Sequence, residues 1–292
     1  MESIQNKKIK ISIKDIGAEL GSIMSLKNNK EYLWRGDSNF WGGQAPILFP
    51  FVGRLKEDTF YIEGKAYSQK QHGFFRRSDE INLVEKTDTK ITYRHTHTNE
   101  TLKVYPFQFE FTTSYELIEN KIIIVHEVVN LGESTMYFSI GEHPAFNCSL
   151  HDENESYDSC SIIFEQEETD DTWNLSNDGL FDNTTTPVLN KTKSLELHKN
   201  SFDKDAMVFK NLNSNKVTLL NANEGPLITV EFKDFPYLGI WSKPNAPFVC
   251  IEPWQGYADA NNSSQKLEEK EAITKLKPKE KHISSYSITI HD

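Results

Sequence analysis

The sequence predicts an all-β fold in which antiparallel strands pack sheet against sheet. Apolar residues recur with a period of two far more often than with the 3.6-residue period of a helix, as in strands with one buried face. Roughly fifteen such segments, separated by short turn signals, run through nearly the whole chain. Because the sequence shows no helix of three turns to cover a parallel sheet, the strands must pair antiparallel and cover one another.

Four segments carry the strand pattern most clearly. Apolar residues alternate with polar ones in residues 9–13, 107–117 and 283–290. Residues 122–129 form a longer apolar run, which is typical of a more deeply buried strand. Between strands, Gly64 is expected to close a hairpin, because a glycine flanked by two alternating runs is a turn signal.

The remaining stretches are less regular. The polar segment 152–190 predicts long surface loops around one short strand at residues 161–164. Residues 265–272 are the best helical candidate, although residues 272–276 fit an edge hairpin equally well. No linker rich in glycine, proline or serine divides the chain, so residues 1–292 are expected to form a single domain.

Charge and cysteine content exclude several classes of function. The chain carries 32 Lys and Arg against 43 Asp and Glu, a formal charge of −11 without a long basic run, so nucleic acid is not an expected partner. The three cysteines, Cys148, Cys160 and Cys250, form no CxxC pair. No apolar run approaches the roughly 20 residues of a membrane span, and the N-terminus lacks the apolar region of a secretory signal. We therefore expect a cytoplasmic location and no membrane contact.

Residues 136–147 depart from the strand pattern in a way that indicates a site. One face of this segment is too polar for a core, and the small residues Ser139 and Gly141 leave room above it. Pro144 should end the strand pairing and leave His143 beside open space. A surface strand explains the alternation but not the open patch that ends in His-Pro, so a functional His143 is favoured.

Glu252 interrupts an otherwise apolar strand. It shares a face with Phe248 and Cys250. An ionised carboxylate in such a strand is costly unless it is paired, and partial burial would raise its pKa towards the range of a general base. A buried structural ion pair, or a strand that reaches solvent just before Glu252, explains the same pattern, so these residues alone leave both interpretations open.

Arg54 and His72 are weaker candidates. Arg54 follows an apolar run and a glycine, so it could be a fixed donor fork rather than a solvated arginine. His72 stands next to Gly73, where the backbone needs freedom; either residue could instead be structural. His72, His143 and Glu252 have the right chemistry to ligate a metal, but they show no diagnostic spacing, so no metal is expected.

Several motifs, in order along the chain, resemble the aldose 1-epimerase (galactose mutarotase) family. The matching segments are Gly17-Ala18-Glu19-Leu20, residues 49–54, His72-Gly73-Phe74, Tyr105-Pro106-Phe107, residues 141–147 and Ile251-Glu252-Pro253-Trp254. The resemblance covers essentially the whole chain and is strongest to the shorter bacterial, LacX-like branch. The chain departs from the better-known galactose mutarotases around His72 and Glu252, so the resemblance supports the reaction class more than the substrate.

The resemblance implies a fold and a set of roles. The fold would be a large antiparallel two-sheet super-sandwich with the sugar in a cleft on a concave sheet face. Glu252 would match the general base and His143 the general acid, while Arg54 and His72 would match residues that bind the sugar and support the developing charge.

Two further roles are less sharply defined. The family has an aspartate that holds sugar hydroxyls; Asp205 is the candidate and Asp203 a close rival. Four tryptophans are open candidates for a ring that stacks on the sugar: Trp34, Trp41, Trp241 and Trp254.

The implied reaction interconverts the α and β anomers of an aldose and requires no cofactor. A base removes the proton of the C1 hydroxyl while an acid protonates the ring oxygen; the open aldehyde turns about C1–C2 and closes on its other face. Base and acid are expected on opposite sides of the anomeric centre, and each typically contributes roughly 10²–10⁴ in rate. Two alternatives stay open: a hexose-phosphate epimerase with Arg76 or Arg77 near the cleft rim, and a sugar-binding protein without useful turnover.

Overall fold

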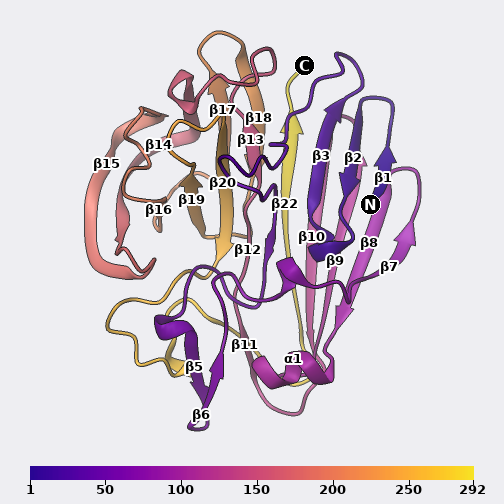
Figure 1. Ribbon diagram of the computed structural model, residues 1–292, viewed down its shortest axis with the longest axis vertical. Coiled ribbons are helices and arrows are strands. Elements are labelled where there is room, and N and C mark those ends of the chain that lie inside the picture. The colour runs from indigo at the N-terminus through magenta and orange to yellow at the C-terminus, as the bar shows by residue number, and fades with distance from the viewer.

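The computed structural model describes all 292 residues and is built almost entirely of antiparallel strands (Figure 1). Its single α-helix is α1 (Asn99–Val104), which Thr98 caps by accepting a hydrogen bond from the Thr101 backbone N–H. Short 3₁₀ turns occupy Ile16–Ala18, Lys56–Asp58, Phe75–Arg77, Tyr157–Ser159 and Leu267–Glu269. The predicted all-β class is confirmed.

A nine-stranded sheet runs through the whole molecule. Its strands, in spatial order, are β15 (Phe181–Glu196), β14 (Cys160–Leu175), β17 (Lys216–Asn221), β18 (Gly225–Glu231), β22 (Lys281–Ile290), β10 (Lys121–Asn130), β9 (Phe109–Ile118), β8 (Lys90–Thr96) and β7 (Asn82–Lys86). Burial alternates along β9 and β10, so each strand turns one face to the core. The strands predicted around residues 107–117, 122–129 and 283–290 are therefore confirmed.

A six-stranded sheet lies beside it and has β20 near its centre. Its path is β16 (Met207–Phe209), β19 (Tyr237–Trp241), β20 (Phe248–Gln255), β12 (Ile140–Glu142) and β4 (Ile47–Leu48), and β13 (Ala145–Asn147) also pairs with β20. All eight residues of β20 are buried. This strand is covered on both faces, so any polar side chain on it must be placed by the fold rather than by solvent.

Three smaller sheets complete the structure. They are the three-stranded β1 (Glu2–Gln5), β2 (Ile9–Ile13) and β3 (Leu20–Ser25), the pair β5 (Thr59–Ile62) and β6 (Lys65–Ser68), and the pair β11 (Met136–Phe138) and β21 (Thr274–Leu276). The β5–β6 hairpin closes at Gly64, where φ is +77°, as the sequence predicts.

Aromatic side chains join the two large sheets. Phe49, which follows β4, packs with ring-centroid distances of 4.9 Å to Phe111 and 5.3 Å to Phe109, both on β9, and 5.9 Å to Phe138. All four rings are fully buried. At about 1.5–3 kcal/mol for each buried large apolar side chain, this cluster contributes strongly to the packing of one sheet on the other.

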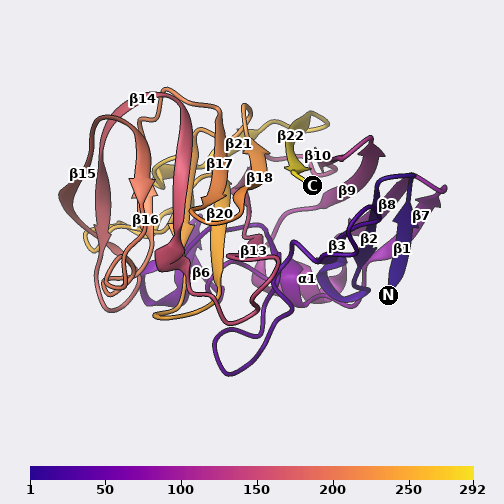
Figure 2. The ribbon, with the colours of Figure 1, turned by 90° about the horizontal axis from the view of Figure 1, so that it is seen from above.

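One part of the sequence-based expectation is wrong. Residues 152–190 do not form long loops around a short strand; β14 and β15 are each 16 residues long and make an extended hairpin, seen at one side of the molecule in Figure 2. Most side chains in the outer part of this hairpin are exposed or half-buried, so its sequence is polar and lacks a hydrophobic period. Backbone hydrogen bonds keep these strands paired, although the side chains show no hydrophobic alternation from which a strand could be predicted.

Residues 265–276 also resolve into defined elements. The helical candidate forms only the 3₁₀ turn Leu267–Glu269, and β21 follows it as a strand paired with β11. No helix anywhere in the chain combines the length and the apolar character that crossing a bilayer requires.

Candidate active site

A polar cavity of about 850 Å³ lies over one face of the six-stranded sheet. Segments far apart in the sequence line it, including the loop around Trp41, the turn 71–77, the tip of the β14–β15 hairpin at 174–182, and the loop 202–208. Glu252 lies in its lining from β20. The cavity therefore exists only once the long-range strand pairing has formed.

On the neighbouring strand, the residue opposite Glu252 is a glycine. Gly239 on β19 stands directly opposite Glu252, and the indole of Trp254 covers that glycine. A Cβ at Gly239 would lie 2.6 Å from the Trp254 ring, so only glycine permits this arrangement. The Glu252 residue is 1% exposed.

His143 reaches the same place because the neighbouring strand is interrupted. The segments β12 and β13 both pair with β20, and His143 and Pro144 fill the gap between them. The Pro144 carbonyl still accepts a hydrogen bond from the Ile251 backbone N–H, which fixes the break next to Glu252. The expected break in the pairing beside His143 is present, but it is an interruption rather than an end, because β13 resumes the pairing with β20 at Ala145.

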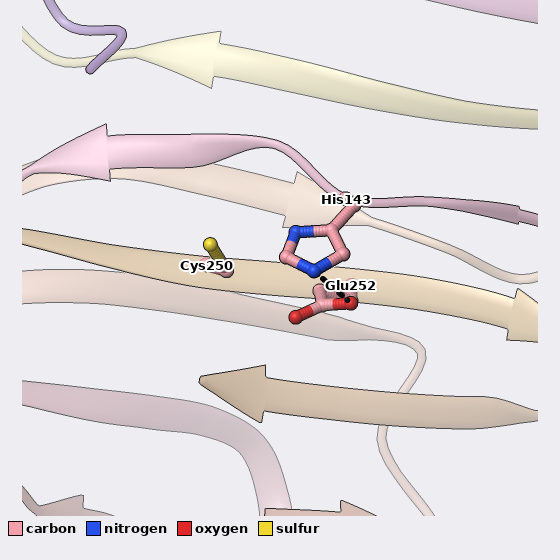
Figure 3. Close-up of side chains that lie close together, drawn as sticks. All are labelled: His143, Cys250 and Glu252. Carbon is pink, nitrogen blue, oxygen red and sulfur yellow. Dashed lines mark ion pairs between the residues drawn. The ribbon is translucent and has the colours of Figure 1, made fainter. Parts of the chain in front are cut away.

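The side chains of His143 and Glu252 are in contact (Figure 3). His143 Nε2 lies 3.3 Å from Glu252 Oε2. Burial, followed by the charge of Asp205, raises the pKa of Glu252 well above its usual value. Burial, followed by the charge of Arg76, lowers the pKa of His143 to about 3. Each shift disfavours the charged form of its group, so burial favours the neutral carboxyl group and the neutral imidazole.

Glu252 Oε2 and His143 Nε2 are in direct contact at 3.3 Å in the unliganded protein. The expectation that base and acid lie on opposite sides of the anomeric centre concerns the sugar complex and stays a prediction. The two oxygens of an anomeric centre are bonded to the same carbon. One of them can therefore contact the carboxyl group while the other contacts the imidazole.

His72 is held rigidly in the cavity wall. Its Nδ1 accepts a hydrogen bond of 3.1 Å from the Gly53 backbone N–H, so the neutral imidazole carries its proton on Nε2. Burial, with smaller effects from His143 and the neighbouring arginines, lowers the pKa of His72 well below its usual value and keeps the ring neutral. His72 can therefore donate a hydrogen bond from Nε2 to a ligand oxygen. Its ring centroid is 5.6 Å from that of His143.

Arg76 and Arg77 line the cavity, whereas Arg54, the arginine expected to bind the sugar, does not. Arg54 is absent from the cavity lining; its Nε lies 3.0 Å from Asp58 Oδ1, and its side chain is 42% exposed. Arg76 is half-buried and is not among the arginines that form ion pairs, which are Arg35, Arg54 and Arg94. Burial, followed by the charge of Arg77, lowers the pKa of Arg76.

Both candidate aspartates line the cavity. Asp205 is the one whose charge raises the pKa of Glu252, which places it nearer the acid–base pair than Asp203. It adopts a φ of +80°, and its Oδ1 accepts a hydrogen bond of 2.8 Å from the Ala206 N–H. The second carboxylate oxygen is left to accept hydroxyl groups from the cavity.

Three of the four candidate tryptophans line the cavity: Trp41, Trp241 and Trp254. Trp41 stacks on the imidazole of His143, with centroids 4.8 Å apart and an angle of 26° between the rings. Trp34 lies instead in the buried layer beneath, and its Nε1–H donates to the Trp41 carbonyl at 2.8 Å. The stack fixes the plane of the imidazole.

A buried carboxylate fixes the loop that carries Trp41. Glu19 Oε1 accepts hydrogen bonds of 2.9 Å from the backbone N–H groups of Gln44 and Ala45. The Gln44 carbonyl in turn accepts from the backbone N–H of Ala145, two residues beyond His143. Glu19 therefore does not contact His143 itself. It fixes the loop that carries Trp41, and this loop is hydrogen-bonded to the strand that follows His143.

Known proteins resemble this chain along nearly its whole length. The family model described as aldose 1-epimerase matches residues 2–289. The chain belongs to the aldose 1-epimerase family. The chromosomal protein LacX of Lactococcus lactis subsp. lactis is 36% identical over 296 residues, which covers 98% of each chain.

Solved structures of the family have the same fold. A galactose mutarotase related enzyme from Lactobacillus acidophilus superposes with a TM-score of 0.93 at 35% identity, covering all of this chain and 97% of the other. A galactose mutarotase-like protein from Lactobacillus casei gives a TM-score of 0.93 at 30% identity and covers both chains fully. The resemblance to this family and the large antiparallel fold of the galactose mutarotase type are both confirmed.

The sequence predicts Arg76 or Arg77 near the cleft rim only for a phosphorylated substrate, and a run of two arginines does not indicate which side chain turns inward. Glu142, next to His143, was not predicted to be buried. It points into the core, where its Oε1 lies 2.8 Å from His126 Nε2 and its Oε2 accepts a hydrogen bond from the Tyr286 hydroxyl. Successive side chains of a β-strand point to opposite faces, so Glu142 faces away from the side on which His143 lies, and this alternation is the signal that marks Glu142.

Proposed function

We propose that the chain catalyses the mutarotation of an aldose, with Glu252 as general base and His143 as general acid. The contact between these two side chains in the lining of a cavity large enough for a sugar carries the proposal. A protein that only binds sugar has no need of a buried carboxyl group in contact with an imidazole. Family membership supports the same reaction class.

The reactive form has the titratable proton of the pair on His143, so that the pair consists of a carboxylate base and an imidazolium acid. Burial shifts both pKa values against this charged form, so the reaction includes transfer of that proton from Glu252 to His143. Glu252 then removes the proton of the C1 hydroxyl while His143 protonates the ring oxygen, and the C1–ring oxygen bond breaks. Rotation about C1–C2 and closure of the ring return the protons, so that no net proton is gained or lost.

The other cavity residues bind and orient the sugar. His72 Nε2–H and the guanidinium of Arg76 are donors that stabilise negative charge on a sugar oxygen as the ring opens. Asp205 accepts hydrogen bonds from hydroxyl groups. None of these roles calls for a cofactor.

A phosphorylated hexose is a second candidate substrate. Besides Arg76, the cavity lining contains Arg77, Lys204 and Lys243. Guanidinium and ammonium groups bind phosphate, and these four occur although the chain as a whole is acidic. The cavity could therefore hold the phosphate of an aldose phosphate while the anomeric carbon meets Glu252 and His143.

A polarimetric comparison of free and phosphorylated sugars tests the proposal. Freshly dissolved α-glucose and α-galactose, and the 6-phosphates of both, are followed as they relax to their anomeric equilibrium. We expect the protein to accelerate at least one free aldose, and the Glu252→Gln variant to give only the buffer rate. Acceleration of the phosphates alone would select the second candidate. If calorimetry showed sugar binding but no sugar relaxed faster, the protein would be a sugar-binding protein and the proposal would be wrong.

A further inference from the structure

A cysteine thiol lies next to the acid–base pair. Cys250 is two residues before Glu252 on β20, and alternate residues of a strand share a face. One potential ligand atom from each of His143, Cys250 and Glu252 lies within 4.8 Å of the other two (Figure 3). All three residues are buried, with exposures of 8%, 0% and 1%. His72, which the sequence placed among possible ligands, is not part of this cluster.

The proposed reaction does not use the Cys250 thiol. Burial, reinforced by the charge of Glu252, raises its pKa well above the usual value, so it takes no part in proton transfer. His143 Nδ1 is buried without a hydrogen-bond partner, and Glu252 Oε2 has only the 3.3 Å contact with His143 Nε2. Unpartnered buried polar atoms in one cluster indicate that something with complementary chemistry can bind among them.

The donor set selects a particular class of ligand. Imidazole nitrogen, thiolate sulfur and carboxylate oxygen are the ligands of Zn²⁺, whereas Ca²⁺ and Mg²⁺ require many oxygens. Bonds of about 2.0–2.3 Å in a tetrahedral site place ligand atoms about 3.3–3.8 Å apart. The present cluster must contract by about 1 Å, which rotation of the Cys250 and Glu252 side chains supplies.

Charge balance favours the same class. A divalent cation bound by one thiolate, one carboxylate and one neutral imidazole gives a site with no net charge. A neutral site is the least costly one to bury. Of the charged neighbours, Asp205 favours a bound cation and Arg76 opposes it.

We propose that His143, Cys250 and Glu252 form a binding site for a borderline-soft divalent cation such as Zn²⁺, and that its occupancy inhibits the enzyme. On binding, the thiol proton and the proton of the acid–base pair pass to solvent, and no electron is transferred. The metal then occupies the lone pairs that the carboxylate and the imidazole need for proton transfer. The inhibition rests on the proposed function, whereas the binding does not.

Metal binding is measured first without any sugar. Zn²⁺ is titrated against a colorimetric chelator in the presence of wild-type protein, Cys250→Ser and the matched control Cys160→Ser, which alters another buried cysteine outside the cluster. We expect one Zn²⁺ per wild-type chain and per Cys160→Ser chain. The Cys250→Ser variant should lose more than the roughly 10–100-fold in affinity that removal of an outer partner of a metal site costs.

A spectroscopic signature and an activity measurement complete the test. Co²⁺ bound to wild-type protein should show a thiolate-to-metal charge-transfer band that is absent in Cys250→Ser. Zn²⁺ should slow mutarotation by wild type but not by Cys250→Ser, and a chelator should never lower activity. Equal Zn²⁺ affinity in wild type and Cys250→Ser, or no stoichiometric binding to wild type, would overturn the site. A bound metal without any mutarotation would leave the site intact and refute the proposed function instead. Near-ultraviolet circular dichroism checks that each variant is folded, and Cys250→Ala provides a second variant at the same position.

Discussion

Replacing Glu252 by glutamine removes the proposed base and keeps the shape of the active site nearly unchanged. The amide has nearly the size of the carboxyl group and remains able to form hydrogen bonds, but it cannot accept a proton from a hydroxyl group. The strand β20 around it is fully buried, so the backbone has little freedom to adjust. A loss of rate therefore reports the loss of the base.

The expected size of the effect follows from the type of catalysis. A positioned proton-transfer group typically contributes roughly 10²–10⁴ in rate, which is about 3–5 kcal/mol of transition-state stabilisation at about 1.4 kcal/mol per tenfold. Glu252 is one half of a contacting pair, so its replacement also removes the partner that shares the proton with His143. We expect kcat to fall by the upper part of this range while sugar binding is nearly unchanged.

The stability of this variant should not fall with its activity. Burial raises the folded-state pKa of Glu252 above its unfolded value, so the wild type is destabilised as the pH rises through the folded pKa. A neutral amide has no such dependence. At neutral pH the free energy of unfolding of Glu252→Gln should equal or exceed that of the wild type.

The assay is polarimetry on a sugar that the wild type accelerates, together with calorimetric binding and urea unfolding of both proteins. A matched control is Glu142→Gln, which alters another buried carboxyl group that does not line the cavity: this carboxyl group contacts His126 and Tyr286 in the core. This control should lose stability through its core contacts and keep the acid–base pair. Near-normal turnover by Glu252→Gln would refute the assignment of the base.

Three further outcomes are expected. Arg76→Met should lower kcat/KM by roughly 10²–10³, which is the cost of losing one hydrogen-bond donor to a developing oxyanion. Arg54→Ala should keep its activity and lose at most about 1 kcal/mol of stability, because its ion pair is exposed. The opposite ranking of the two variants in the polarimetric assay would restore Arg54 to the site. Because the pKa of His143 is lowered to about 3, the stability that it contributes is complete above the unfolded pKa of about 6.5 and is lost as the pH falls towards 3. Between about pH 7 and pH 5, the free energy of unfolding in urea should fall less in His143→Gln than in wild type. An equal fall in both proteins would contradict the pKa shift. Gly73→Ala should lower the free energy of unfolding by more than about 1 kcal/mol, because φ is +66° and the added Cβ would lie 2.3 Å from a backbone carbonyl oxygen. The matched control is Gly64→Ala, because Gly64 has a φ of +77° and open space around it. If both variants lowered the melting temperature equally, the close approach at Gly73 would be disproved.

The strand pattern of the core was readable because the hydrophobic effect acts residue by residue. An antiparallel strand with one buried face must alternate, and β2 and β9 do so clearly. The β14–β15 hairpin could not be predicted from the hydrophobic pattern, because that pattern arises only where a strand is buried. Much of its length lies outside the core, so its side chains are free to be polar while its backbone stays paired.

Local chemistry marks His143 and Glu252 as unusual residues, but their roles as acid and base were implied only by the resemblance to the family. Pro144 cannot donate a hydrogen bond to a neighbouring strand, so a break beside His143 follows from the sequence. A lone carboxylate in an apolar strand such as β20 demands a special environment wherever the strand lies. Both inferences needed only nearest neighbours in the chain.

Only the tertiary structure decided which side chains meet. It turned Arg76 rather than Arg54 into the cavity, and it placed His143 in direct contact with Glu252 and next to Cys250. Sequence sets the period and the breaks of each strand because these depend on local backbone geometry and burial. The composition of the cavity depends on long-range pairing, in which β12 and β13 both join β20, and on the direction each side chain takes once that pairing has formed.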